Sequence, residues 1–234
     1  MLTVDFNRLA LAPGMRVLDA GCGQGRHICE AFRRIGVDVC AVDLRWDDLC
    51  RTRGYLSHLA AEKGGQWGVF QGAVTRLPFR DAVFDVVICS EVLEHIPEDH
   101  EAAAEIVRII KPGGELVVSV PRYLPERICW LLSRSYHEEP GGHIRIFKQR
   151  ELRRLLEDAG ANCTAVRYKQ ALHAPYWWLK CLVGHKNDDQ PLVKLYQKFL
   201  EWDIMTHPMS VRTLERLLDP LIAKSVVYYM KKGN

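Results

Sequence analysis

The stretch that decides the fold is Val17-Leu18-Asp19-Ala20-Gly21-Cys22-Gly23-Gln24-Gly25. It reads as a short apolar strand that ends in Asp, followed by alternating glycines, which let a backbone turn tightly and approach a ligand closely. The next residues place apolar side chains at helical spacing before Gly36, namely Ile28, Ala31, Phe32 and Ile35. A strand, a glycine loop and a helix whose first amides face that loop predict a nucleotide-sized binding cavity.

The spacing of the glycines separates two kinds of nucleotide site. Nicotinamide and flavin sites use G-x-G-x-x-G, but Arg26 stands where their third glycine belongs and Gly25 comes one residue early. The pattern D-x-G-x-G-x-G instead resembles motif I of the class I S-adenosylmethionine-dependent methyltransferases. The ligand of that family has no phosphate and carries an ammonium and a sulfonium, which suits the acidic Asp19. We therefore expect cofactor contacts from Asp19, Gly21, Cys22, Gly23 and Gly25.

The later segments follow in the order that this family requires. Buried strands are expected at 37–43, 67–72, 84–90 and 115–120, a sixth at about 162–168 and a last one at 225–231. Helices are expected from the apolar faces of 102–110, stopped by 111–114, and of 152–159. The resemblance implies a doubly wound, Rossmann-like α/β fold. Its sheet has seven mostly parallel strands, with the last strand antiparallel beside the sixth.

Further cofactor contacts are expected after the second, third and fourth strands. Asp43 ends the second strand, where a carboxylate can accept both ribose hydroxyls. The resemblance places Leu44 against the adenine and the loop that contains Ala73 and Val74 at the adenine edge; many relatives carry Asp where this chain has Ala73. Residues 84–95, F-D-V-V-I-C-S-E-V-L-E-H, and the following K-P-G-G closely resemble the subgroup that includes ubiquinone-biosynthesis enzymes. This string adds Ser90 and Glu91 to the expected cofactor contacts, and the resemblance covers about residues 15–168.

Two insertions are expected to recognise the acceptor, because only about fifteen residues precede the first strand. We predict one domain over 1–234, with substrate-cap insertions at about 122–147 and 171–224. The second is too long for a hairpin loop and predicts a helical cap. It contains the aromatic segment 173–183, which would line an apolar substrate pocket, rest on a membrane interface or pack the cap onto the sheet. The sequence leaves these three interpretations open.

The amino-acid composition limits the classes of protein and of partner that the chain fits. Of the 234 residues 48% are hydrophobic, yet no uncharged run reaches the ~20 residues that span a bilayer, and no signal segment is evident. The eight cysteines lack a C-x-x-C pair, which favours reduced thiols, a cytoplasmic location and a packing role for Cys22. Residues 161–234 hold 11 Lys and Arg against 6 Asp and Glu. This excess fits an anionic substrate, peripheral membrane contact or ordinary solvated helix faces, and a net charge of +3 does not favour nucleic acid.

The expected chemistry is in-line methyl transfer, for which the protein aligns donor and acceptor and excludes water. An oxygen or nitrogen acceptor must lose a proton, and His143 is the first candidate base because many relatives carry H-x-R-x-F after the fifth strand; His95 is the second. Clusters of the E-x-x-E-H type hold magnesium in some relatives, which would make Glu91, Glu94, His95 and His143 ligands. The same string occurs in relatives without a metal, so we assign no metal ligand from the sequence.

The predicted function is S-adenosylmethionine-dependent methylation of a small molecule, with an O-methylated metabolite, glycan or lipid precursor as the acceptor. Two alternatives remain. An RNA 2′-O-methyltransferase predicts steep salt dependence of substrate binding. A non-catalytic S-adenosylmethionine-binding regulator predicts cofactor binding without turnover. The acceptor, the attacked atom and the oligomeric state are not determined by the sequence.

Overall fold

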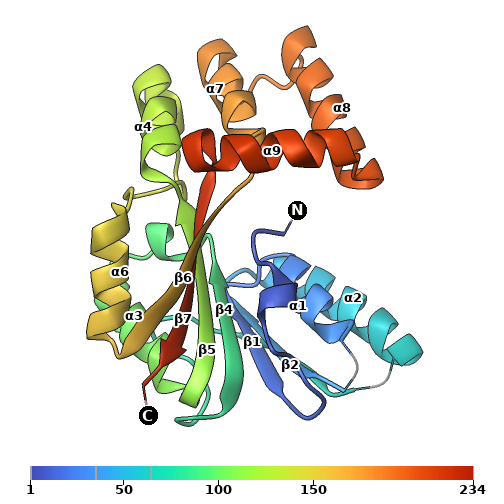
Figure 1. The fold of residues 1–234 in the computed structure, drawn as a ribbon, viewed down its shortest axis with the longest axis vertical. Helices are drawn as coiled ribbons and strands as arrows, with labels where there is room; N and C mark the ends of the chain where they lie inside the picture. The colour runs from blue at the N-terminus through green and yellow to red at the C-terminus, as the bar shows by residue number, and fades with distance from the viewer. Residues whose placement is uncertain (1, 35, 64, 234) are drawn as a thin grey trace.

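The computed structural model describes residues 2–34, 36–63 and 65–233. Within these residues the core is one seven-stranded sheet with the order β3-β2-β1-β4-β5-β7-β6 (Figure 1). Its strands are β1 Arg16–Ala20, β2 Asp38–Asp43, β3 Trp67–Gln71, β4 Phe84–Ser90, β5 Ile110–Pro121, β6 Ala161–Lys169 and β7 Ser225–Lys232. The first five strands run parallel, and β7 lies antiparallel between β5 and β6. The predicted fold class is confirmed.

Helices cover both faces of the sheet. On one face lie α1 Arg26–Phe32 and α2 Trp46–Lys63, and on the other lie α3 Asp99–Arg108 and α6 Gln149–Asp158 (Figure 1). The side chains of β4 alternate between the two resulting cores: Val86 and Ile88 join the first, and Val87 and Cys89 join the second. Both faces of this central strand are therefore buried, which explains why its sequence is an almost unbroken apolar run.

The predicted end of the helix over residues 102–110 is wrong, because Ile110 belongs to the following strand. We expected Ile110 on the inner face of the helix and a stop at 111–114, but α3 ends at Arg108 and β5 begins at Ile110. Ile110 pairs with Phe84 in the parallel ladder, ahead of a register shift in β4, so strand pairing extends β5 through the Pro-Gly-Gly segment. Ile35, predicted on the inner face of the first helix, lies outside the described residues.

The two insertions are helical and contact each other above the carboxyl ends of the parallel strands (Figure 1). Their helices are α4 Tyr123–Leu132 and α5 Arg134–His137 in the first, and α7 His173–Val183, α8 Pro191–Thr206 and α9 Met209–Ile222 in the second. We call these five helices the cap. None of the cap helices, and no other helix in the described ranges, is long and apolar enough to cross a bilayer.

The aromatic segment of α7 packs the cap helices together. Trp178 Nε1 donates a hydrogen bond to the Pro125 carbonyl of α4 at 3.0 Å. The Trp177 ring contacts Tyr136 of α5, and the Tyr176 ring contacts Tyr196 of α8. These contacts join the cap helices to one another and not to the sheet, so the three interpretations left open by the sequence stay predictions.

Candidate active site

A cavity of about 900 Å³ opens at the carboxyl ends of β1, β2 and β4. This is the edge at which doubly wound sheets bind ligands. The cavity is lined by nine predicted cofactor residues and by one predicted catalytic residue, namely Gly21, Cys22, Gly23, Asp43, Leu44, Ala73, Val74, Ser90, Glu91 and His95. The structure thus brings together residues from four separate loops of the sequence.

The glycine loop is held in one conformation from two sides. Gly21 and Gly23 have positive φ angles of 77° and 50°, and a methyl group at Gly21 would collide with the Val92 side chain. The Gly23 amide donates to Asp43 Oδ2 at 2.8 Å, while Thr52 Oγ1 donates to the Gly23 carbonyl at 2.9 Å. The loop is therefore tied to the end of β2 and to α2 before any ligand binds.

Two predicted cofactor residues do not line this cavity. Asp19 is 1% exposed and accepts a hydrogen bond from the Ile28 amide at 3.2 Å, so its carboxylate holds the start of α1 from behind the loop. Burial raises the pKa of Asp19 to about 7. Gly25 caps α1, and a side chain there would press on Thr52. Both residues therefore shape the loop without lining the cavity, and their contacts with a cofactor stay predictions.

Cys22 lines the cavity but has the properties of a packing residue. Its side chain is buried, and its Sγ donates to the Gly23 carbonyl at 3.4 Å. Burial raises the pKa of the thiol well above its ordinary value, so the nucleophilic thiolate is not populated near neutral pH.

The wall formed by β2 and β3 combines a carboxylate with an apolar surface. Asp43 is oriented by two backbone amides, those of Gly23 and Arg45, at 2.8 and 2.9 Å. The Leu44 side chain is 66% exposed at the cavity, as expected for a residue that a flat ring would cover. Ala73 offers no polar side chain here, so polar recognition of a base at this point falls to backbone groups.

Sequence reasoning missed a hydroxyl network under the cavity. Thr3 Oγ1 lies 2.8 Å from Ser90 Oγ and 3.0 Å from His27 Nε2, and Ser90 Oγ lies 2.7 Å from Ser119 Oγ. Burial lowers the pKa of His27 to about 3, so this imidazole stays neutral. The N-terminal segment therefore packs beneath the site through Thr3, although no local pattern around Thr3 indicates it.

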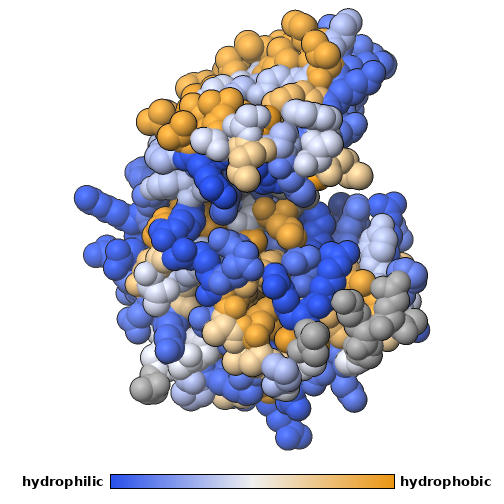
Figure 2. All heavy atoms as spheres, turned by 45° about the vertical axis from the view of Figure 1, so that its right-hand side comes forward, coloured by the Kyte–Doolittle hydropathy of each residue, from blue (hydrophilic) through white to orange (hydrophobic). Residues whose placement is uncertain are grey.

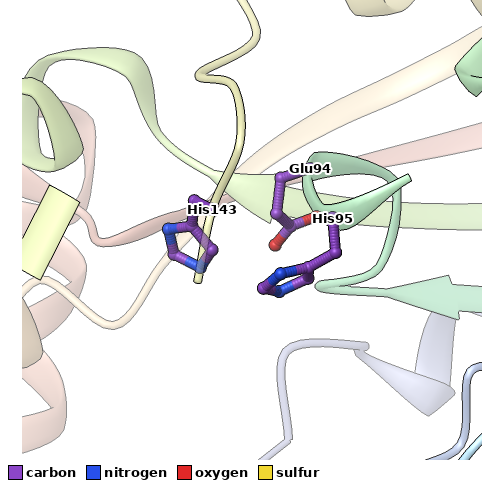
Figure 3. Close-up of side chains that lie close together, drawn as sticks. All are labelled: Glu94, His95 and His143. Carbon is purple, nitrogen blue, oxygen red and sulfur yellow. The ribbon is translucent and has the colours of Figure 1, made fainter. Parts of the chain in front are cut away.

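The predicted catalytic histidines lie together at the edge of the cavity. The rings of His95 and His143 are 4.9 Å apart between centroids, and one ligand atom from each, with one from Glu94, all lie within 4.8 Å of one another. Figure 3 shows the Glu94 carboxylate beside the His95 ring, facing the His143 ring across an open space. His143 itself does not line the cavity, but its neighbour Gly141 does. We call these three residues the Glu-His-His cluster.

The Glu94 carboxylate is buried without a partner. The residue is 1% exposed, and neither carboxylate oxygen has a hydrogen-bond partner in the described part of the chain. Burial, together with the neighbouring Glu91 carboxylate, raises the pKa of Glu94 well above its ordinary value. A buried carboxylate that is bonded to nothing is costly, so its partner is expected to come from outside the chain.

Both imidazoles of the cluster are oriented from behind. His95 Nδ1 lies 3.0 Å from the Gly142 carbonyl, and His143 Nδ1 lies 2.6 Å from Glu126 Oε1. Carbonyl and carboxylate oxygens only accept, so Nδ1 carries a proton in each ring, and Nε2 is the nitrogen whose lone pair a neutral ring would offer to a ligand. Burial alone would raise the pKa of Glu126, but the hydrogen bond from His143 holds this pKa below its ordinary value. Tyr136 also donates to Glu126 Oε1, at 3.0 Å.

Glu91 does not belong to this cluster. Its side chain accepts a hydrogen bond from Ser119 Oγ at 3.1 Å and lines the cofactor cavity. Its φ angle is 57°, a conformation that costs a non-glycine residue energy and that concentrates at functional sites. The possible ligand set of four residues is therefore reduced to three.

Comparison with known proteins places this site in a family. Residues 3–166 match the family model described as a methyltransferase domain. A demethylmenaquinone methyltransferase from Parafrankia sp. is 36% identical over 55% of this chain, and a ubiquinone biosynthesis O-methyltransferase from Hahella chejuensis is 32% identical over 58%. These matches span only 56% and 60% of the two relatives' own lengths.

Other proteins whose structures have been solved share this fold. A SAM-dependent methyltransferase from Methanosarcina mazei superposes with a TM-score of 0.62 over 95% of this chain and 94% of its own, at 17% identity. At this identity the likeness supports the fold alone, and the family model carries the identification. The chain belongs to the class I S-adenosylmethionine-dependent methyltransferases, and S-adenosylmethionine is its cofactor.

Proposed function

We propose that this enzyme methylates an oxygen atom of a small hydroxylated acceptor, and that the Glu-His-His cluster holds a divalent cation which binds that oxygen. The observation that carries the proposal is the convergence of Glu94, His95 and His143 at the edge of the cofactor cavity. A carboxylate and two imidazoles form a donor set that divalent cations accept. One relative is named as an O-methyltransferase of ubiquinone biosynthesis, and by analogy the acceptor is a phenolic quinone precursor.

The cluster fits a cation by two independent criteria. A cation supplies the partner that the buried Glu94 carboxylate lacks. It also uses the Nε2 lone pairs that the Gly142 carbonyl and the Glu126 carboxylate leave available by fixing Nδ1 as the donor. When bound, a cation would polarise the acceptor hydroxyl and lower its pKa.

The cofactor is held on the other side of the cavity. S-adenosylmethionine supplies a methyl group on a sulfonium. In this proposal Asp43 accepts from the ribose hydroxyls and Leu44 covers the adenine, since both residues line the cavity. The tied glycine loop offers a rigid surface, so donor and acceptor are aligned without reorganising the backbone.

The charge of the cavity argues against RNA as the acceptor. Its wall carries four carboxylates and two guanidinium groups, from Asp43, Asp48, Glu91, Glu98, Arg26 and Arg45. This excess of negative charge suits a sulfonium cofactor and disfavours a polyanion. RNA methylation therefore has no specific support in the structure.

The test uses the full chain, methyl-labelled S-adenosylmethionine and catechol as a probe with two adjacent hydroxyls. We expect chelator treatment to abolish methylation and added Mg²⁺ or Mn²⁺ to restore it. His143→Ala is expected to lower turnover much more than cofactor affinity. If the chelator has no effect on methylation but His143→Ala abolishes it, then His143 acts as a general base and the proposed cation is refuted. Cofactor binding without methylation of catechol or of extract fractions would favour the non-catalytic regulator.

A further inference from the structure

The end of the cap farthest from the sheet exposes a group of leucines. α4 starts directly after β5 and α7 starts just after β6, so both helices run away from the sheet, and α8 returns from the same end (Figure 1). The last residues of α4 and α7 and the first residues of α8 therefore meet there, because α7 packs against both other helices. The leucines at this end are 37–74% exposed: Leu131, Leu132, Leu182, Leu192 and Leu195. We call these five residues the apolar tip.

Hydrophobic residues are also exposed elsewhere on the cap. Figure 2 shows hydrophobic residues gathered over the upper part of the molecule, where the cap lies, while the lower part is mostly hydrophilic. Exposed single leucines are normal on proteins, but several from three helix ends on one protruding end are not. All five members of the tip are aliphatic, and they come from the protruding ends of three helices.

The charged residues around the tip leave a positive excess. The nearby acidic side chains are neutralised by ion pairs: Glu138 with Arg134, Glu139 with Lys186, Asp188 with Lys180 and Asp189 with Lys194. Arg127 on α4 and Lys198 on α8 have no ion-pair partner in the described part of the chain. Both can extend their charged ends beside inserted leucines, as cations at membrane surfaces do.

We propose that the apolar tip docks reversibly on the surface of a lipid bilayer, with the leucines in the acyl–headgroup boundary and Arg127 and Lys198 among anionic headgroups. Aliphatic side chains at protruding helix ends need no shape-matched partner in a bilayer, and a residual positive charge matches anionic lipid. The cofactor cavity lies at the base of the cap, so docking leaves its lining residues uncovered. The proposal goes beyond methyl transfer and does not depend on it.

The experiment measures co-sedimentation of the full chain with vesicles of phosphatidylcholine alone and with a quarter of phosphatidylglycerol. Leu131→Ser/Leu182→Ser/Leu192→Ser is compared with Leu217→Ser, a matched control in which an equally exposed leucine of α9 at the base of the cap is replaced. We expect the parent and Leu217→Ser to bind the anionic vesicles. The triple variant is expected to bind at least tenfold more weakly, since each inserted leucine contributes about tenfold. Arg127→Gln/Lys198→Gln is expected to lose only the preference for anionic lipid.

Three outcomes would overturn the proposal. The first is a parent chain that does not bind anionic vesicles, and the second is a triple variant that binds as well as the parent. The third is a stable dimer of the parent that the triple variant disrupts, without vesicle binding by either, because the tip would then be an interface between two copies. Thermal unfolding of all variants separates these results from loss of fold. Cofactor binding by the triple variant, measured by calorimetry, is expected to equal that of the parent.

Discussion

Replacing Glu126 with glutamine removes one negative charge behind His143 and keeps the hydrogen-bond geometry. Oε1 of Glu126 accepts from both His143 Nδ1, at 2.6 Å, and the Tyr136 hydroxyl, at 3.0 Å. The carbonyl oxygen of glutamine has two lone pairs and can accept both bonds. Glu126→Gln is therefore expected to change the free energy of unfolding by less than about 1 kcal/mol. Affinity of the cluster for a cation is expected to fall by roughly 10- to 100-fold, because the carboxylate raises the basicity of the imidazole.

Glu126→Ala removes the acceptor as well as the charge. The residue is 2% exposed, so two donors lose a partner in an environment that water enters poorly. A hydrogen bond to a charged group contributes about 1.5–3 kcal/mol, and relief of the buried charge offsets part of the loss. We expect Glu126→Ala to lower the free energy of unfolding by about 2–4 kcal/mol, which urea titration followed by circular dichroism would measure.

The pH dependence of unfolding supplies a second measurement. The folded-state pKa of Glu126 lies below its ordinary value of 4.5, so its contribution to stability is complete above pH 4.5 and is lost as the pH falls through the lower value. Glu126→Gln should flatten this acid dependence. If Glu126→Gln binds the cation and turns over substrate as well as the parent does, the Glu126 carboxylate does not strengthen cation binding at the cluster. A Glu126→Gln protein as unstable as Glu126→Ala would show that the charge serves the fold.

Three further predictions concern the cofactor cavity and the glycine loop beside it. Asp43→Ala is expected to weaken S-adenosylmethionine binding by roughly 1–3 kcal/mol through lost charge-assisted hydrogen bonds, and unchanged affinity by calorimetry would contradict its placement. Gly21→Ala should lower the free energy of unfolding by roughly 1–3 kcal/mol, read by urea titration, because a methyl group there meets Val92 and φ is positive. The pKa of Asp19 is raised from 3.8 to about 7, so the folded state favours the neutral acid and stability falls as the pH rises between these values. Asp19→Asn, which keeps an acceptor for Ile28, should therefore be more stable than the parent at pH 8 by roughly 2–4 kcal/mol in thermal unfolding, and an equal or lower stability would contradict the burial argument.

The sequence predicted those parts of the fold whose signal is local. The run from Phe84 to Ser90 matches β4 at both ends, since a strand buried on both faces is apolar throughout. The glycine loop was predicted because its positive φ angles require glycine at fixed spacing. The start of β5 at Ile110 was missed, because pairing with Phe84 depends on a partner 26 residues away and leaves no pattern around Pro112.

At the site, the sequence predicted the path of the backbone better than the direction in which individual side chains point. Asp19 lies one residue before the end of β1, at Ala20, close to where the sequence placed the strand end. Whether its carboxylate points into the cavity or behind the loop depends on how α1 packs against β1. Thr3 joins Ser90 only because the N-terminal segment crosses the sheet edge. No sequence window contains both residues, so periodicity and motif spacing carry no information about this contact.

All three residues of the proposed Glu-His-His cluster were named from the sequence, but only the structure shows that they lie together. His143 comes from an insertion, whereas Glu94 and His95 come from the loop after β4. The insertion is fixed to that loop by backbone groups: the Ile144 amide donates to the Glu94 carbonyl at 3.0 Å, and the Gly142 carbonyl accepts from His95. Arg145 adds an ion pair with Asp99 and a hydrogen bond to the Pro97 carbonyl. The cluster therefore forms only when the insertion docks, and docking also brings in Glu126 from α4. Orientation of His143 thus depends on the folded insertion, so a variant that loosens the cap is expected to damage the cluster before it affects the cofactor cavity.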